Sequence, residues 1–124
     1  MGKSFHDDVL DGALNILKNN VTRMTVCHTE PTTYTEAITT YELADVTIDS
    51  SDFTNADGDS SGRKTTVGSQ AAVVIDNSGT ATHIALVDVS NTKLLAVTTC
   101  NSQGLTLGNA VTFPAFDFEF TDPT

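Results

Sequence analysis

The second half of the chain consists of short apolar segments separated by turn-forming residues. Between residues 71 and 120, runs rich in Val, Ile, Leu and Phe alternate with stretches rich in Asn, Ser, Gly and Thr. This pattern is typical of antiparallel strands joined by hairpins and loops. The apolar segments are AAVVID, THIALVD, KLLAVTTC and VTFPAFDFEF. We expect them to form a compact, rigid β-module that carries surfaces.

The last of these segments changes phase in its middle. Val111 and Phe113 occupy odd positions, whereas the aromatic residues that follow occupy even positions. Because side chains along a strand point to alternate faces, a bulge or bend at Pro114–Ala115 is predicted to switch the phase. Proline also suits an edge position, since it has no amide hydrogen to donate. The even-numbered aromatic residues are Phe116, Phe118 and Phe120.

Apolar residues near the N-terminus recur with helical spacing and predict an amphipathic helix over about residues 5–18. Ser4 is a candidate N-cap, and Asp7 and Asp8 fall in the first turn, where the helix dipole favours negative charge. Gly12 is the one local cost to this helix. The apolar stripe comprises Phe5, Val9, Leu10, Ala13, Leu14 and Leu17.

The middle of the chain has weaker patterns. We expect strands at Thr22 to His28, around Val46 to Ile48, and at Lys64 to Val67. Residues 33–43 fit either a helix or extended chain, because their apolar residues have helical spacing while their many Thr favour strands. The most polar stretch, about residues 49–62, is rich in turn formers and predicts a surface loop or a wide hairpin.

Together these elements predict one mainly β domain over residues 1–124, with a β-module from about 22 to 120 behind the helix. The expected fold is a small antiparallel β-sandwich or barrel with one N-terminal α-helix. A chain of 124 residues is long enough to bury a core of its own.

The charge of the chain narrows the choice of partners. A net charge of −10 and a sequence pI of about 4.3 oppose contact with phosphate backbones and anionic lipids. We therefore expect no direct nucleic-acid partner and no membrane partner. The acidic charge either keeps the chain soluble or steers it onto a basic protein surface. Acidic residues stand where a signal peptide has an apolar stretch, which predicts synthesis in a cytosol and reduced thiols at Cys27 and Cys100.

No catalytic motif stands out along the chain. The sequence contains no G-x-S-x-G elbow, no P-loop and no dinucleotide-binding fingerprint. His83 lies among apolar strand residues and is predicted to be a packed, hydrogen-bonded histidine. Cys27 and His28 are adjacent and therefore point to opposite faces of a strand, which disfavours a shared zinc ion. We expect no enzymatic activity, no catalytic residue and no cofactor.

One segment is similar to the start of a calcium-binding loop. Asp57, Asp59 and Ser61 alternate ahead of Gly62. An EF-hand also needs a bidentate Glu at its twelfth position, and that position here is Gly68. The segment is therefore predicted to be an acidic surface turn, and we expect no metal site.

The order of three segments resembles that of small virion structural proteins of tailed bacteriophages. These segments are FHDDVLDGALNIL, GTATHIALVDVSNTKLLAVTTC and GLTLGNAVTFPAFDFEF. The resemblance covers nearly the whole chain, its motifs are structural, and it supplies no catalytic residues. It implies a virion protein that is made in the host bacterial cytoplasm. The acidic segment of residues 50–62 departs from the pattern of this family.

Within that class, the resemblance implies first a capsid decoration (cement) protein that binds the outer surface of the major capsid protein lattice and stabilises the head. A homo-oligomer is expected, and a trimer suits capsid quasi-symmetry. The alternatives are a fibre-like or tail/vertex attachment module for host-surface binding, and a head–tail connector or neck subunit. The candidate assembly residues, which either fill the core of the domain or contact a partner, are Phe5, Val9, Leu10, Phe116, Phe118 and Phe120.

Overall fold

The computed structural model describes residues 3–122 as a mainly β protein with a long N-terminal helix, and every strand pairing in this range is antiparallel. The helical elements are α1 (Asp7–Asn20), the π-helical turn η1 (Glu36–Thr40) and the 3₁₀ turn η2 (Ser50–Asp52). The strands are β1 (Arg23–Cys27), β2 (Glu42–Thr47), β3 (Phe53–Asp57), β4 (Arg63–Val67), β5 (Gln70–Val74), β6 (Gly79–Asp88), β7 (Lys93–Leu105), β8 (Ala110–Phe113) and β9 (Phe116–Phe120).

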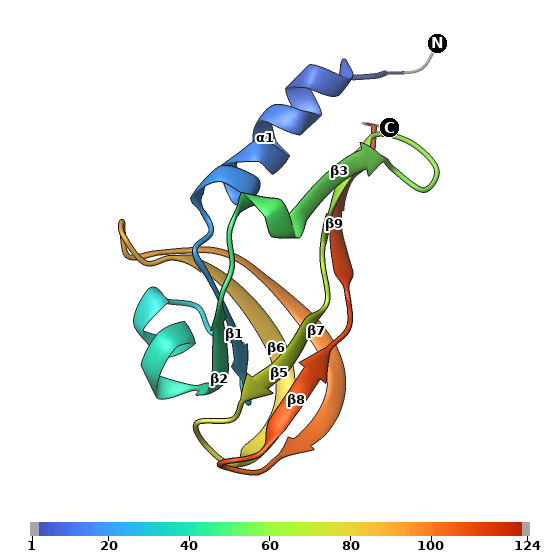
Figure 1. Cartoon of the computed structure of the whole chain (residues 1–124). Helices are drawn as coiled ribbons and strands as arrows, with labels where there is room; N and C mark the ends of the chain where they lie inside the picture. The colour runs from blue at the N-terminus through green and yellow to red at the C-terminus, as the bar shows by residue number, and fades with distance from the viewer. Residues whose placement is uncertain (1–2, 123–124) are drawn as a thin grey trace.

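Two layers of strands enclose the core, which confirms the predicted β-sandwich type with one N-terminal helix. One layer is a four-stranded sheet in the order β2-β1-β6-β7, whose long β6–β7 hairpin curves around the molecule (Figure 1). The other layer consists of the sheet β3-β4-β9 and the pair β5-β8. The fully buried side chains between the layers include Met24, Val26, Leu43, Val67 and Leu86.

Apart from β3, the second layer is one bent ribbon of two long strands. Only residues 68–69 separate β4 from β5, and only Pro114–Ala115 separate β8 from β9. β4 pairs with β9, with Val67 opposite Phe116, and β5 pairs with β8 in a register that continues across the gap. The predicted irregularity at Pro114–Ala115 is confirmed, and it divides the expected terminal strand into two strands. β9 lies at the edge of its sheet.

The last fifty residues do not form a module by themselves, contrary to the sequence-based expectation. β6 pairs with β1 as well as with β7, and β9 pairs with β4. The apolar segments were identified correctly, but their local spacing carries no information on which distant strand each one joins.

The ambiguous residues 33–43 form η1 and the beginning of β2. η1 covers the outer face of the four-stranded sheet, where a second buried cluster contains Ala37, Ala85 and Val87. Tyr34 and Ile38 pack against this cluster. Both faces of the four-stranded sheet are therefore covered, at least in part.

Of the two predictions for residues 49–62, the surface loop is wrong in most of its length, whereas a hairpin does form, between β3 and β4. Asp49 caps η2 by accepting a 2.9 Å hydrogen bond from the Ser51 amide, and β3 follows directly. Only residues 58–62 form the turn between β3 and β4. At Gly62, φ is +72°, and a Cβ would lie 1.9 Å from the carbonyl oxygen of Phe120, so glycine is required there.

The N-terminal helix lies slightly further along the chain than predicted, at Asp7–Asn20 instead of about 5–18. Its cap is His6, not Ser4. The imidazole Nδ1 of His6 accepts a 3.1 Å hydrogen bond from the Asp8 amide. This bond satisfies one of the free amide groups at the start of the helix.

Cys27 and Cys100 lie on opposite faces of the four-stranded sheet. Cys27 is opposite His83, which is opposite Thr99 on β7, so Cys27 and Thr99 share a face while Cys100 points the other way. The buried Cys27 thiol donates to the carbonyl of Ala37 over 3.6 Å, and burial raises its pKa to about 11. Both thiols are free.

Adding a reductant should therefore leave the stability of the protein unchanged. We expect identical melting curves with and without dithiothreitol, because Cys27 and Cys100 point to opposite faces of the sheet and cannot form a disulfide bond. Circular dichroism and non-reducing mass spectrometry check this prediction. A large loss of stability on reduction would instead indicate a Cys27–Cys100 bridge.

Candidate functional site

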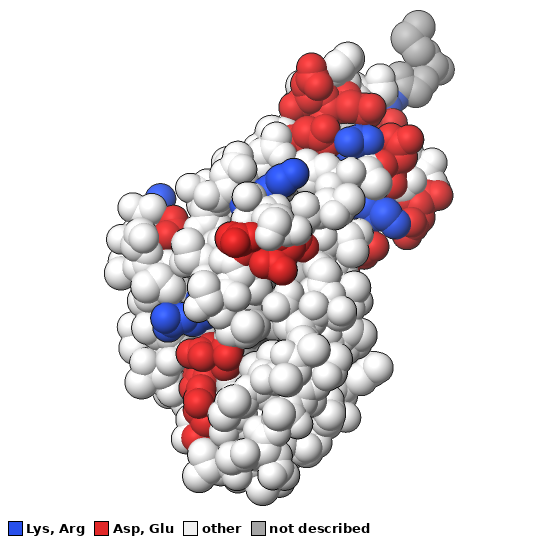
Figure 2. All heavy atoms as spheres, in the orientation of Figure 1, with Lys and Arg blue, Asp and Glu red and all other residues white. Residues whose placement is uncertain are grey.

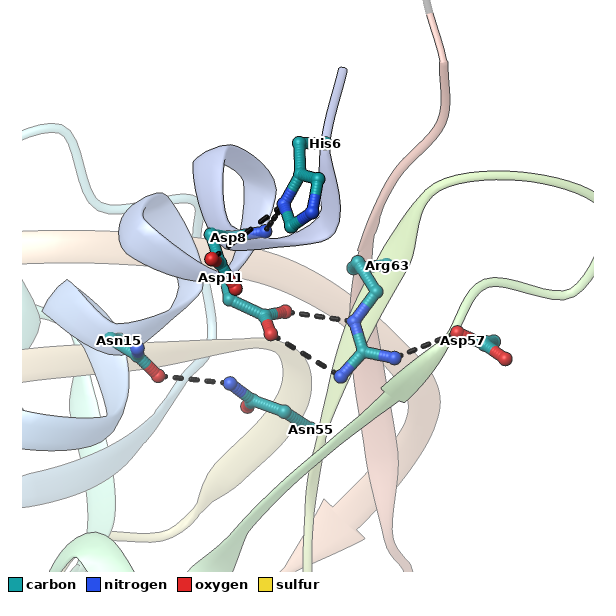
Figure 3. A network of polar contacts seen from close by, with 7 residues as sticks. All are labelled: His6, Asp8, Asp11, Asn15, Asn55, Asp57 and Arg63. Atoms are coloured by element: carbon teal, nitrogen blue, oxygen red, sulfur yellow. Dashed lines mark hydrogen bonds and ion pairs between the residues drawn. The ribbon is translucent and has the colours of Figure 1, made fainter. Parts of the chain in front are cut away.

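Helix α1 is fixed to the second layer by apolar and polar contacts. Leu10 and Leu14 form the buried face of the helix. Arg63 on β4 reaches up from the sheet and donates to Asp11 through Nε at 2.9 Å and Nη2 at 3.3 Å (Figure 3). Its Nη1 donates to Asp57 over 2.7 Å. The hydrogen bonds to Asp11 raise the pKa of the guanidinium group most, and the bond to Asp57 raises it further.

A further polar contact joins the helix to β3. The Asn55 side-chain amide donates to the side-chain oxygen Oδ1 of Asn15 over 2.9 Å. Bidentate arginine–carboxylate pairs are among the more specific polar contacts in proteins. α1 is therefore held at one angle to the sheet, and any surface that it forms with neighbouring strands is pre-organised.

An apolar groove of about 300 Å³ runs between α1, β7 and β9. Within α1, Ala13 and Ile16 line it, and Val9 shares their helix face because it lies one and two turns before them. Exposure is high for large apolar side chains: 58% for Val9, 55% for Ile16 and 47% for Phe120. We call this surface the apolar groove; its lining residues are Ala13, Ile16, Leu17, Leu95, Ala96, Phe118, Glu119 and Phe120.

The six candidate assembly residues are divided between core and surface. Leu10 is buried, and Phe116 and Phe118 are half-buried side chains that pack against the core. These two rings meet edge to face, with centroids 5.9 Å apart. The exposed members are Phe5, Val9 and Phe120.

The structure brings Phe118 and Phe120 together in the apolar groove, whereas Phe116 lies at the bend of the ribbon. Sequence reasoning missed Ile16, although its helical spacing from Val9 and Ala13 was a usable signal. It also missed Leu95 and Ala96, whose role depends on how β7 curves past the helix.

A second hollow of about 460 Å³ lies at the ribbon bend, between β6–β7 and Pro114–Ala115. Its lining includes Ile84, Cys100 and Phe116, with polar groups from Thr99, Asn101 and Gln103. No charged side chain lines it among the described residues. This hollow therefore provides no charged group that could bind an ion or act as an acid or base.

Charge is distributed unevenly over the molecule. Figure 2 shows acidic atoms gathered at the end that carries the first turn of α1 and the β3–β4 turn. At this turn, Asp57 at the end of β3 pairs with Arg63 on β4, and Asp59 within the turn pairs with Lys64 on β4 over 2.7 Å. The carboxylates of the predicted acidic turn are thus engaged with protein cations. In the lower half of the face shown, charged atoms gather along one side, where a red patch lies below a blue group, and the rest of that half is white.

Three carboxylates form a separate cluster at the edge of β2. One oxygen of each of Glu42, Asp45 and Asp76 lies within 4.8 Å of the other two, and within residues 3–122 this is the one such group of three side chains that could hold a metal ion. Glu42 is only 8% exposed. Burial, and then the hydrogen bond and charge of Asp76, raise the pKa of Glu42 to about 8.

Comparison with known proteins does not assign a family. No protein-family model matches the chain, and no curated protein and no solved structure matches it. Within the part of the chain that the structure describes, no helix is long and apolar enough to span a membrane.

The raised pKa of Glu42 predicts a pH-dependent stability. In EDTA-containing buffer, the free energy of unfolding should fall as pH rises from about 4.5 to about 8. The unfolded chain loses the Glu42 proton at the lower value while the folded chain keeps it, so rising pH favours unfolding within this window. Urea denaturation at several pH values measures the slope, which Glu42→Gln should flatten. An equal slope in the wild type and in Glu42→Gln would contradict the assignment; the exposed Glu30→Gln is the matched control.

Phe118 and Val9 should differ sharply in their effect on stability. Phe118→Ala should reduce the free energy of unfolding by about 2 kcal/mol, less than for a fully buried Phe. Phe118→Asp should prevent soluble folding or lower stability further, because it places a charge against the core. Val9→Ala, at an exposed position, should change stability by no more than about 0.5 kcal/mol. Chemical denaturation compares the three variants, and an unchanged stability for Phe118→Asp would show that this ring does not support the core.

Proposed function

We propose that this chain is a non-enzymatic structural protein of a tailed-phage virion, and specifically a decoration protein on the outer surface of the major capsid lattice. The observation that carries the proposal is the exposed apolar groove on a helix that is fixed rigidly to the sandwich. Large apolar side chains exposed side by side and bordered by charged groups are typical of protein interaction sites. The resemblance to virion structural proteins supplies the identity of the partner.

In the proposed contact with the capsid protein, the apolar groove and the acidic end of the molecule would have different roles. Val9, Ile16 and Phe120 would provide the apolar centre of the contact, and the acidic end of the molecule would lie at its rim. A stable contact needs about 1,000 Å² or more of buried surface. A homo-oligomer, with a trimer favoured by capsid quasi-symmetry, would supply this area from several copies.

A different surface favours the alternative of a fibre-like or tail attachment module. Val74, at the end of β5, and Leu107, in the connection between β7 and β8, are exposed. These segments lie at the end of the molecule opposite the first turn of α1 (Figure 1). A host-surface attachment module would use that end and would leave the apolar groove to another virion protein. Variants at the two ends can therefore distinguish the two roles. The connector role has no surface feature of its own in its favour.

The experiment is to mix the purified protein with capsids that lack it and to image them by cryo-electron microscopy. We expect regular density over the capsid lattice. Ile16→Asp and Phe120→Asp should reduce occupancy strongly, because each places a charge in the contact. Leu107→Asp is the matched control and should bind as the wild type does.

Other outcomes move the assignment. Density only at one vertex or on tails would favour the connector or attachment role, and loss of binding in Leu107→Asp alone would place the contact at the other end of the molecule. Capsids that stay bare would contradict the decoration role. Light scattering after size-exclusion chromatography tests the trimer separately.

A further inference from the structure

A bulge in β2 decides which of its acidic side chains share a face. Cys27 on β1 lies opposite Glu42 on β2, and Thr25 lies opposite Asp45. One residue separates the two β1 positions but two residues separate the β2 positions, so β2 carries one extra residue, a bulge. Residues opposite one another in a ladder point to the same face of the sheet. Glu42 and Asp45 therefore share a face, although residues three apart on a regular strand point to opposite faces.

The turn after β5 adds the third carboxylate. The amide of Asp76 donates to the carbonyl of Leu43 over 2.7 Å, and the amide of Asn77 donates to the same carbonyl over 3.0 Å. The Asn77 side chain donates to the carbonyl of Glu42, also over 3.0 Å. This turn is thus fixed along the edge of β2, which brings the Asp76 carboxylate to within 4.8 Å of the other two.

Glu42 is the unusual member of the cluster. Its side chain is more than nine-tenths buried, and its Oε1 has no hydrogen-bond partner among the described residues. The Arg23 guanidinium lies near Asp45 at 3.9 Å, at the outer limit of an ion pair. A buried carboxylate oxygen without a partner is costly, and a bound cation would supply the missing contact.

We propose that Glu42, Asp45 and Asp76 bind a divalent cation that prefers oxygen ligands, with Ca²⁺ bound more tightly than Mg²⁺. Three carboxylates are a donor set typical of such ions. Calcium–oxygen distances of about 2.3–2.6 Å allow ligands up to about 5 Å apart across the ion, and the oxygens of the cluster lie within 4.8 Å of one another. Mg²⁺ requires shorter distances and a stricter octahedron.

The surroundings suit an ion of this charge. The three carboxylates together with Arg23 leave an excess of two negative charges when all are ionised, and the exposed Asp76 leaves an open side for water ligands. The ion would join β2 in the four-stranded sheet to the turn after β5 in the other layer. It would thereby stabilise the sandwich, whatever the role of the chain in a virion.

The test is calorimetric titration of the EDTA-stripped full chain with CaCl₂ and with MgCl₂, together with thermal melts. We expect a Kd for Ca²⁺ of about 10⁻⁵–10⁻³ M, weaker binding of Mg²⁺, and a melting temperature that rises with Ca²⁺. Glu42→Gln and Asp76→Asn should each weaken Ca²⁺ binding by about tenfold or more. Asp59→Asn, in the β3–β4 turn, is the control and should bind as the wild type does.

The proposal is overturned if the wild type shows neither heat nor a shift in melting temperature. It is also overturned if Ca²⁺ binding is lost in Asp59→Asn and kept in Glu42→Gln, because the ion would then lie in the β3–β4 turn. If Glu42→Gln does not fold, the exposed Asp76→Asn decides alone: wild-type affinity in that variant removes Asp76 from the site and overturns the proposal.

Discussion

The bend in the two-stranded ribbon is the constraint on which both functional surfaces depend. On one side of the bend, β9 carries Phe118 and Phe120 up to α1; on the other side, β5 leads into the turn that brings Asp76 to β2. Pro114 has no amide hydrogen, so the ladder cannot close there. Opposite the gap, the amide of Gly68 donates to the carbonyl of Asp52 over 2.8 Å, which extends the β3–β4 pairing by one residue.

The apolar groove and the carboxylate cluster each keep a group in an unfavourable environment, but the environments are opposite. The apolar groove exposes side chains that would be more stable out of water, on a helix that Arg63 holds in place. The carboxylate cluster buries a polar atom that would be more stable in water. In each case the surrounding structure opposes the local relaxation that would remove the cost, and such retained costs are frequent at interaction and binding sites.

Local periodicity predicted the elements that carry their own pattern. The stripe ahead of residue 18 predicted α1, alternation predicted β1, β6 and β7, and the phase change at Pro114 predicted the interruption before β9. β3 was missed because its sequence, FTNAD, is rich in residues that favour turns, and only its pairing with β4 makes it a strand. The helical stripe was predicted as one surface, but the structure divides it into a buried face and an exposed one, since only the sheet beneath decides which side is covered.

The carboxylate cluster was beyond sequence reasoning for a similar cause. Glu42 and Asp45 lie three apart on a strand, a spacing that predicts opposite faces, and the bulge that reverses this expectation has no local signature. Asp76 joins them only through backbone bonds to β2 from a distant turn. Long-range pairing, rather than composition, creates this group.

The uneven distribution of carboxylates also means that an external electric field would orient the molecule in solution. On the face shown in Figure 2, acidic atoms are most concentrated at the end that carries the first turn of α1 and the β3–β4 turn, so the charge of this net anion is unevenly spread. Near a positively charged surface it would rotate before touching, with the α1 end leading, within a range of about 8 Å at physiological ionic strength. Orientation during approach would then precede apolar contact, and added salt would slow the encounter more than it would loosen the bound state.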